Sequence, residues 1–242
     1  MSIDCFECPL RRRDAFAPFS EEELRFMRRF KVGELVVDAG TPLLSEGSNA
    51  PQLYTALRGM GLRYKTLANG RRQVVNFVFP GDFVGLQAGV MGEMRHSVEA
   101  TTRMTLCVFD RSDFWNFVRG NSTRAYDLIW LAAVEESFLG DALTTIGQRS
   151  AMERIAWALT RITLRARALG LGDGWSVPLP FRQQDLADAL GLSLVHTNKT
   201  IARLRERQLV TWTGGRLSVP DLAALAGIAH MDLEAVQVRP LL

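Results

Sequence analysis

The sequence FRQQDLADALGLSLVHTNKTIARLRERQL, from Phe181 to Leu209, predicts two short helices joined by a sharp turn. Apolar residues within 183–190 recur at the spacing of a helix face. Gly191 is expected to end this first helix in a left-handed conformation. Ser193 is a suitable N-cap for a second helix over 194–208. A short helix, a glycine turn and a second helix form the helix-turn-helix pattern, whose second helix enters the major groove of DNA.

The second helix is basic, and a hairpin signal follows it. It carries Lys199, Arg203, Arg205 and Arg207. The next segment, VTWTGGRLSV over 210–219, has two central glycines and predicts a two-residue hairpin. The helix spacing alone also fits an ordinary helical hairpin with a solvated basic face. The hairpin favours a winged helix-turn-helix, in which the wing touches the phosphate backbone.

Charge is distributed unevenly along the 242 residues. The formal net charge is only +3, but the segment 149–216 carries eleven Lys or Arg against five Asp or Glu. That segment is therefore +6 and the remainder is −3. A basic C-terminal half beside an acidic remainder is typical of a nucleic-acid-binding domain.

Several protein classes are disfavoured by composition. No run of 18 apolar residues indicates a transmembrane helix, and the first residues lack the pattern of a signal peptide. Three cysteines are too few for a disulfide framework and suit a reducing compartment. We therefore expect a cytoplasmic protein with no membrane partner.

The residues before the basic segment predict a β-rich domain. Ser20 and Glu23 have capping-box spacing at the start of a helix over 20–29. From about residue 30 to 114, glycines recur between short segments rich in β-branched and aromatic residues. Asn69-Gly70 between two such segments predicts a hairpin. Many short strands at near-regular spacing indicate a β-barrel or jelly roll.

A long helix is expected over about 121–147. An apolar stripe spaced by three or four residues indicates either a helix packed on its own domain or a two-stranded coiled coil. A dimer is favoured, because a helix-turn-helix usually reads a two-fold symmetric site. The residues of this expected interface are Leu128, Leu131, Val134, Phe138, Ala142 and Ile146.

The predicted fold class is α+β. The expected organisation is an N-terminal cysteine-containing segment (1–19), a jelly-roll sensor domain (20–120), a dimerisation helix (121–150) and a winged helix-turn-helix DNA-binding domain (151–242).

This order resembles the Crp/Fnr superfamily of bacterial transcription regulators over about residues 5–228. The specific matches are PGDFVG at 80–85 and LADALGLSLVHTNKTIARLRE at 186–206, whose VHTNK segment is similar to a VHxNR variant of the recognition helix. The resemblance implies a cyclic-nucleotide-binding-like β-roll. It also implies a homodimer that binds a palindromic promoter site and contacts RNA polymerase.

The resemblance places the family's base-reading positions on Leu194, Val195, Asn198 and Lys199. Many members have Glu in place of Val195 and Arg in place of Lys199, so we expect a different target sequence. A Glu accepts from cytosine, whereas Val makes only apolar contact, and Lys lacks the bidentate Arg fork. The candidate DNA-contacting residues are Ser193, Leu194, Val195, His196, Thr197, Asn198, Lys199 and Arg203.

The position of the cyclic-nucleotide site departs from the branch that binds cyclic AMP. That branch has a Glu where this chain has Leu86, and an adjacent Arg-Ser pair where His96 separates Arg95 from Ser97. The departures argue against a cyclic nucleotide as the effector.

The Fnr branch is the closer match and implies a [4Fe–4S] cluster. Cys5 and Cys8 have the spacing of its first cysteine pair, and Cys107 falls at its central position. Thiolates are the usual ligands of such clusters. The third N-terminal cysteine is absent, and spacing puts Asp14, a harder ligand, near its place. The fourth ligand would therefore be Asp14 or an external group, unless the site is a relic. The alternatives are a buried apolar role for Cys107 and exposed thiols at Cys5 and Cys8.

Two other functions are compatible with the sequence. One is a regulator of the same type without a cluster, controlled by a small ligand around Phe79, Phe83 and Leu86 or by its abundance. The other is a cupin-like metal enzyme, which needs a cluster of His and carboxylate ligands on the strands. His96 is the one histidine there, so an enzyme is not expected.

Overall fold

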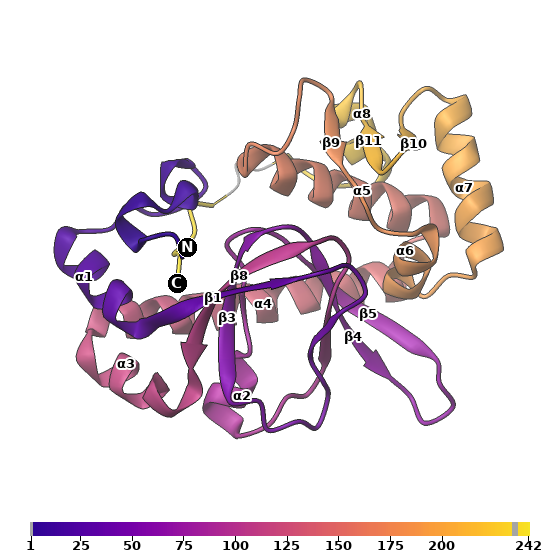
Figure 1. The fold of residues 1–242 in the computed structure, drawn as a ribbon. Coiled ribbons are helices and arrows are strands. Elements are labelled where there is room, and N and C mark those ends of the chain that lie inside the picture. Colours follow the sequence, from indigo (N-terminus) through magenta and orange to yellow (C-terminus); the bar gives the residue numbers. More distant parts are fainter. Residues whose placement is uncertain (1, 234–236) are drawn as a thin grey trace. The chain divides into compact units, whose positions relative to one another are not determined.

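The computed structural model describes residues 2–233 and 237–242. The chain forms two compact units, Met1–Glu135 with Val238–Leu242, and Glu136–Gln237 (Figure 1). The chain therefore leaves the first unit, builds the second, and returns to the first. We call Val238–Leu242 the return segment. No helix among the described residues is long and apolar enough to cross a membrane.

The first unit contains the expected β-roll, built from two four-stranded sheets. One sheet has the order β1-β8-β3-β6 and the other β2-β7-β4-β5, and every pairing is antiparallel. The strands are β1 (Lys31–Val37), β2 (Pro42–Leu44), β3 (Gln52–Arg58), β4 (Gly61–Thr66), β5 (Arg72–Val78), β6 (Phe83–Val84), β7 (Ser97–Ala100) and β8 (Met104–Asp110).

Short helices surround these strands. They are η1 (Cys5–Glu7), η2 (Pro9–Arg12), α1 (Glu21–Phe30), α2 (Leu86–Met91), η3 (Arg111–Asp113) and α3 (Phe114–Gly120). The predicted capping box of α1 is confirmed, because the Ser20 side chain accepts from the Glu23 amide and Glu23 accepts from the Ser20 amide. Two reciprocal bonds satisfy donors that the first helical turn leaves unpaired.

The predicted hairpin at Asn69-Gly70 is also confirmed. Strands β4 and β5 pair from Gly61↔Val78 to Thr66↔Arg72, so the connection is 67–71. Gly70 has a φ of +80°, which explains why glycine occupies this position. The core between the sheets is closed by apolar side chains such as Leu53, Val98 and Leu106, which are fully buried.

The long helix is α4 (Ser122–Gln148), and the boundary between the two units falls within it. The expected separate dimerisation domain, 121–150, is thus divided between both units. The expected DNA-binding domain, 151–242, also differs, because 238–242 belongs to the first unit. Contacts that the return segment makes with residues far away in the sequence cause this second difference.

Within one copy of the chain, Leu128 of the predicted dimer stripe is buried, and the other five members of the stripe are half-buried. Leu128 is buried in the β-roll core and Leu131 packs against it. Phe138 stacks on Trp157, with 6.1 Å between ring centroids. Ile146 lies beside Gly191. Val134 and Ala142 are half-buried.

The second unit contains the winged helix-turn-helix. Its elements after α4 are α5 (Ala151–Ala168), β9 (Ser176–Pro178), α6 (Gln183–Leu190), α7 (Leu194–Glu206), β10 (Thr211–Thr213), β11 (Arg216–Ser218) and α8 (Leu222–Ile228). Strand β11 pairs with β10 and β9 to form a three-stranded antiparallel sheet. Figure 1 shows α6, α7 and this sheet in orange to yellow.

Local signals in the second unit are mostly confirmed. Gly191 ends α6 with a φ of +65°, and the Ser193 side chain caps α7 by accepting from the His196 amide. Gly214 and Gly215 both have positive φ, as a two-residue hairpin of type I′ requires. The second helix ends at Glu206 rather than Gln208, because Gln208 has a φ of +60°.

Candidate functional site

The exposed face of α7 carries most of the predicted DNA-contacting residues. Val195 is 65% exposed, and the other exposed members are Ser193, Leu194, His196, Asn198, Lys199 and Arg203. Ile201 and Leu204 face inward and fix the helix to its domain. The N-terminal turn of α7 thus presents apolar, amide and cationic groups together, which suits contacts with base edges and phosphates.

Thr197 is the exception, and its prediction as a DNA-contacting residue is wrong. Its side chain is completely buried, so it packs toward the interior of its own domain. The helix period explains the error, because Thr197 lies three and four residues before the buried Thr200 and Ile201.

A second exposed surface runs along α4 and is largely apolar. Tyr126, Ile129 and Leu143 are 63%, 67% and 74% exposed. With Ala133, Glu136 and Gly140, which are also exposed, they form steps of three and four residues along the helix. We call these six residues the α4 seam. The spacing is that of a heptad repeat, and it lies on a different face from the predicted stripe.

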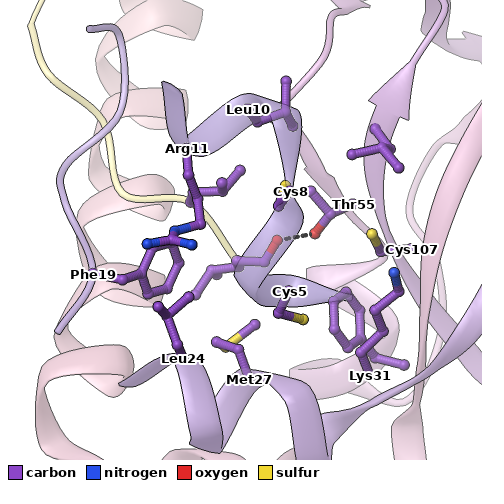
Figure 2. Close-up of a pocket in the computed structure, with 14 residues that line it drawn as sticks. Cys5, Cys8, Leu10, Arg11, Phe19, Leu24, Met27, Lys31, Thr55 and Cys107 are labelled. Carbon is purple, nitrogen blue, oxygen red and sulfur yellow. Dashed lines mark hydrogen bonds between the residues drawn. The ribbon is translucent and has the colours of Figure 1, made fainter. Parts of the chain in front are cut away.

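The three cysteines line one pocket in the first unit (Figure 2). Cys5 belongs to η1, Cys8 follows it, and Cys107 lies on β8 opposite Thr55 of β3. The structure thus places the N-terminal pair and the central cysteine in the wall of the same pocket. The remaining lining is largely apolar: Leu10, Arg11, Phe19, Leu24, Met27, Lys31, Thr55, Leu57, Phe109, Leu241 and Leu242.

Lys31 brings a positive charge to this pocket, and Figure 2 shows its side chain reaching toward Cys107. Its Nζ lies 2.7 Å from Glu34 Oε1 and 2.6 Å from the Ile3 carbonyl oxygen. Burial acts to lower the pKa of Lys31, but the Glu34 hydrogen bond and the neighbouring thiols raise it above its ordinary value. The ammonium is therefore retained beside the sulfur atoms.

Burial has the largest effect on the pKa values of two thiols, Cys107 and Cys5. It raises the pKa of Cys107 to about 12 and that of Cys5 above its usual value, while the Lys31 charge acts in the opposite direction. Cys107 is consequently a neutral thiol at physiological pH. Forming a thiolate there requires a further positive charge, which a bound metal centre supplies.

The predicted fourth ligand is not part of the pocket. Asp14 is exposed and does not line it. As the side chains stand in the described residues, no group of three or more His, Cys, Asp or Glu is arranged to hold a metal ion. Three soft thiols match the donor chemistry of an iron–sulfur cluster at three of its four corners. The free space is about 40 Å³, enough for a few waters, so a cluster needs a wider pocket.

The positions of the cyclic-nucleotide site are engaged internally. Arg95 pairs with Glu93 at 2.8 Å, and the Ser97 hydroxyl accepts from the Glu46 amide at 3.0 Å. Phe79 and Phe83 are buried and Leu86 packs on the core. These three residues do not line the cysteine pocket.

Sequence reasoning missed Lys31, the α4 seam and the return segment. Lys31 and Glu34 lie three residues apart at the start of β1, a spacing that has no special meaning in a strand. The α4 seam could have been found by testing both apolar faces of the long helix. The return segment carries no recognisable signal.

Two parts of the chain match known families of protein domains. Residues 34–121 match the cyclic nucleotide-binding domain family, and residues 153–228 match the Crp-like helix-turn-helix domain family. The chain is 31% identical to the nitrogen fixation regulation protein FixK of Bradyrhizobium diazoefficiens, over 93% of both chains.

Two further relatives extend the comparison. The transcriptional activator protein FnrL of Cereibacter sphaeroides is 27% identical over 94% of this chain and 92% of its own length. The solved structure of FixK2 from Bradyrhizobium japonicum has a TM-score of 0.74 and 25% identity, covering 84% of this chain and 98% of that one.

Proposed function

Because the chain belongs to the Crp/Fnr family of DNA-binding transcription regulators, we propose that it binds a palindromic promoter site as a homodimer. Members of this family are transcription regulators and not enzymes, which removes the metal-enzyme alternative. In the proposal each copy places α7 in one major groove, and the two grooves are successive half-sites.

The observation that carries the proposal is the composition of the exposed N-terminal turn of α7. Val195, Asn198 and Lys199 are exposed together on it. Val195 supports apolar contact with a thymine methyl group, Asn198 supports pairing with adenine, and Lys199 supports donation to guanine. Arg203, one turn further along, supports contact with a phosphate.

The dimer is supported by the α4 seam. Exposed apolar residues at heptad spacing are unusual on a helix that stays in water, and they suit pairing with the same helix of a second copy. Gly140 has open space around it, so a partner helix can approach closely at that point. This surface lies on a different face of α4 from the stripe of Leu128 to Ile146.

The test identifies the DNA sequence that the chain selects and the number of copies that bind each duplex. Duplexes bound by the full chain are selected from a random pool and sequenced, and the mass of the complex is measured by sedimentation. We expect an inverted repeat whose half-sites are about 10 base pairs apart, with two copies per duplex. A motif without two-fold symmetry, or one copy per duplex, would contradict the proposal.

The relatives support proposals for the direction of regulation and for the cellular compartment. FnrL is named a transcriptional activator, so we propose that this chain activates transcription from its promoters through contact with RNA polymerase. Promoter DNA and polymerase are cytoplasmic in bacteria, and the protein is proposed to act there.

The cysteine pocket is the proposed sensing site. Cys5, Cys8 and Cys107 would hold an iron–sulfur cluster, and Lys31 would balance part of the negative charge of the thiolates. When bound, the cluster supplies a group that changes with oxygen or redox state. A second candidate is a small apolar ligand, which the apolar lining favours. A third is control by abundance alone.

The discriminating measurement uses protein purified without oxygen. Its visible absorption, iron and acid-labile sulfide are compared with those of Cys107→Ala. Absorption and iron that are lost in the variant support the cluster. Iron-free, colourless protein that still binds DNA would reject it and direct attention to an apolar ligand.

A further inference from the structure

The return segment joins the first unit by adding to its N-terminal segment. Arg239 forms a parallel bridge with Phe16. The Ala17 amide donates to the Arg239 carbonyl at 2.8 Å, and the Arg239 amide donates to the Ala15 carbonyl at 2.9 Å. The peptide is therefore held through its backbone, as in strand addition to an exposed edge.

Two leucines of this segment reach the cysteine pocket. Leu241 and Leu242 are buried and belong to the pocket wall that also holds Cys5, Cys8 and Cys107. The Thr55 hydroxyl donates to the Leu242 carbonyl, and Figure 2 shows this bond as the dashed line. Since only about 40 Å³ stays free, the leucines occupy space that a larger bound group would need.

Charged contacts connect the same segment to the PGDFVG turn at 80–85 and to α4. Arg239 Nη1 lies 3.3 Å from Asp82 Oδ1, and Asp82 also accepts from the Phe79 amide at 2.9 Å. Arg124 of α4 donates to the Leu241 carbonyl at 3.4 Å. The buried Arg124 also pairs with Glu23 and Asp127, each at 2.9 Å, so the segment is coupled to the start of the long helix.

We propose that the return segment is an intramolecular ligand of the cysteine pocket, and that its docking excludes any bound group much larger than water. Filling the pocket releases the segment, and emptying the pocket lets it dock. Release removes the Leu241 contact from Arg124 and thereby changes the start of α4. The biological meaning rests on the proposed sensing role of the pocket, but the docking equilibrium exists without it.

The balance of forces suits such an exchange. Burial of two leucines and a few hydrogen bonds favour docking. Ordering the backbone of five residues opposes it to a similar extent. A segment with this balance opens locally without unfolding the domain.

The test measures thiol accessibility in reduced, metal-free protein without DNA. A stop codon after Gln237 removes the return segment, and the alkylation rate of Cys107 by iodoacetamide is followed by mass spectrometry. We expect the rate to rise about tenfold or more. Addition of the peptide VRPLL at millimolar concentration should restore the slow rate, which a merely misfolded variant would not show. An unchanged rate, or no recovery with peptide, overturns the proposal.

Point variants cover the case in which the truncated chain does not fold. Arg239→Ala and Thr55→Val should each raise the rate about two- to fivefold and speed hydrogen exchange at the Arg239 amide. Val238→Ala is the matched control, since Val238 is 55% exposed, and it should change neither. Exchange at Arg239 that is equal in all three variants contradicts docking. Because iron and DNA are absent throughout, failure of the cluster or of the palindromic site does not affect these results.

Discussion

Lys31 Nζ lies 2.7 Å from Glu34 Oε1, and only 7% and 11% of the two side chains are exposed. The Glu34 carboxylate also accepts from the Ile3 amide at 2.8 Å. Burial alone would raise the pKa of Glu34, but these hydrogen bonds hold it below its ordinary value. The pair thus fastens the N-terminal segment to β1 and sets the electrostatics of the cysteine pocket.

Removing one partner of this pair should destabilise the protein strongly. Lys31→Met leaves the Glu34 charge buried and unpaired, and we expect a loss of roughly 2–4 kcal/mol in the free energy of unfolding. The double variant Lys31→Met with Glu34→Leu should recover most of the loss, because it leaves no orphaned charge. Urea denaturation of the single and double variants measures both. A double variant as unstable as Lys31→Met would show that the ion pair is not the cause.

The α4 seam predicts which substitutions break the dimer. Leu143→Glu places a charge at a largely exposed seam position, so each isolated copy should fold normally. The dimer dissociation constant should rise roughly thirtyfold or more, because the variant buries an unpaired charge in the interface. Val90→Glu changes another exposed apolar residue, which is 57% exposed and lies away from α4, and serves as the control. Sedimentation equilibrium gives the constants, and equal values for both variants would remove the seam from the interface.

Residue 195 should set the base preference at one position of each half-site. Val195→Glu introduces an acceptor that favours cytosine, whereas Val favours the thymine methyl group. Lys199→Ala removes a donor and should weaken binding to the selected site by about 1–3 kcal/mol. Competition binding with base-substituted duplexes measures both the change in base preference and the loss of affinity. An unchanged preference for Val195→Glu would place this side chain away from the bases.

Stability should fall in mild acid because of His96. Burial and the nearby Arg63 and Lys65 lower its pKa to about 4, although Glu135 and Glu46 act in the opposite direction. Between pH 6.5 and about 4 the unfolded chain binds a proton at this residue and the folded chain does not. The free energy of unfolding therefore decreases as the pH falls through this range, by up to about 3 kcal/mol.

The variant His96→Gln isolates this contribution from that of the carboxylates. Its stability should fall less than that of the natural chain between pH 6.5 and 4, while both should behave alike above pH 7. Thermal unfolding across this range provides the comparison. Identical slopes would show that His96 titrates normally in the folded protein.

Local signals allowed much of the fold to be predicted from the sequence. The helices that Ser20 and Ser193 cap begin directly after them, and Gly191 ends the helix directly before it. Asn69-Gly70 likewise forms the turn between the two strands that flank it. Such interactions span a few residues, so their spacing is visible in the sequence. The three cysteines could be brought together only through the resemblance to a family, since Cys8 and Cys107 are far apart in the chain.

Other features depend on contacts that the sequence does not encode locally. Helix α4 has two apolar faces, and periodicity does not tell which one packs on the chain's own domains. Burial of Thr197 and exposure of Asp14 depend on the orientation of their elements by the surrounding structure. The return segment depends on Asp82, Thr55 and Arg124, which lie more than 110 residues before it.

The return of the chain to its first unit sets the local concentration of the return segment at the cysteine pocket. A peptide tethered to its own groove is present at an effective concentration on the order of millimolar. A cysteine pocket that binds the free peptide only weakly can therefore keep the tethered segment docked about nine-tenths of the time or more. A change at the cysteines that weakens docking about tenfold would then lower the docked fraction to about one half.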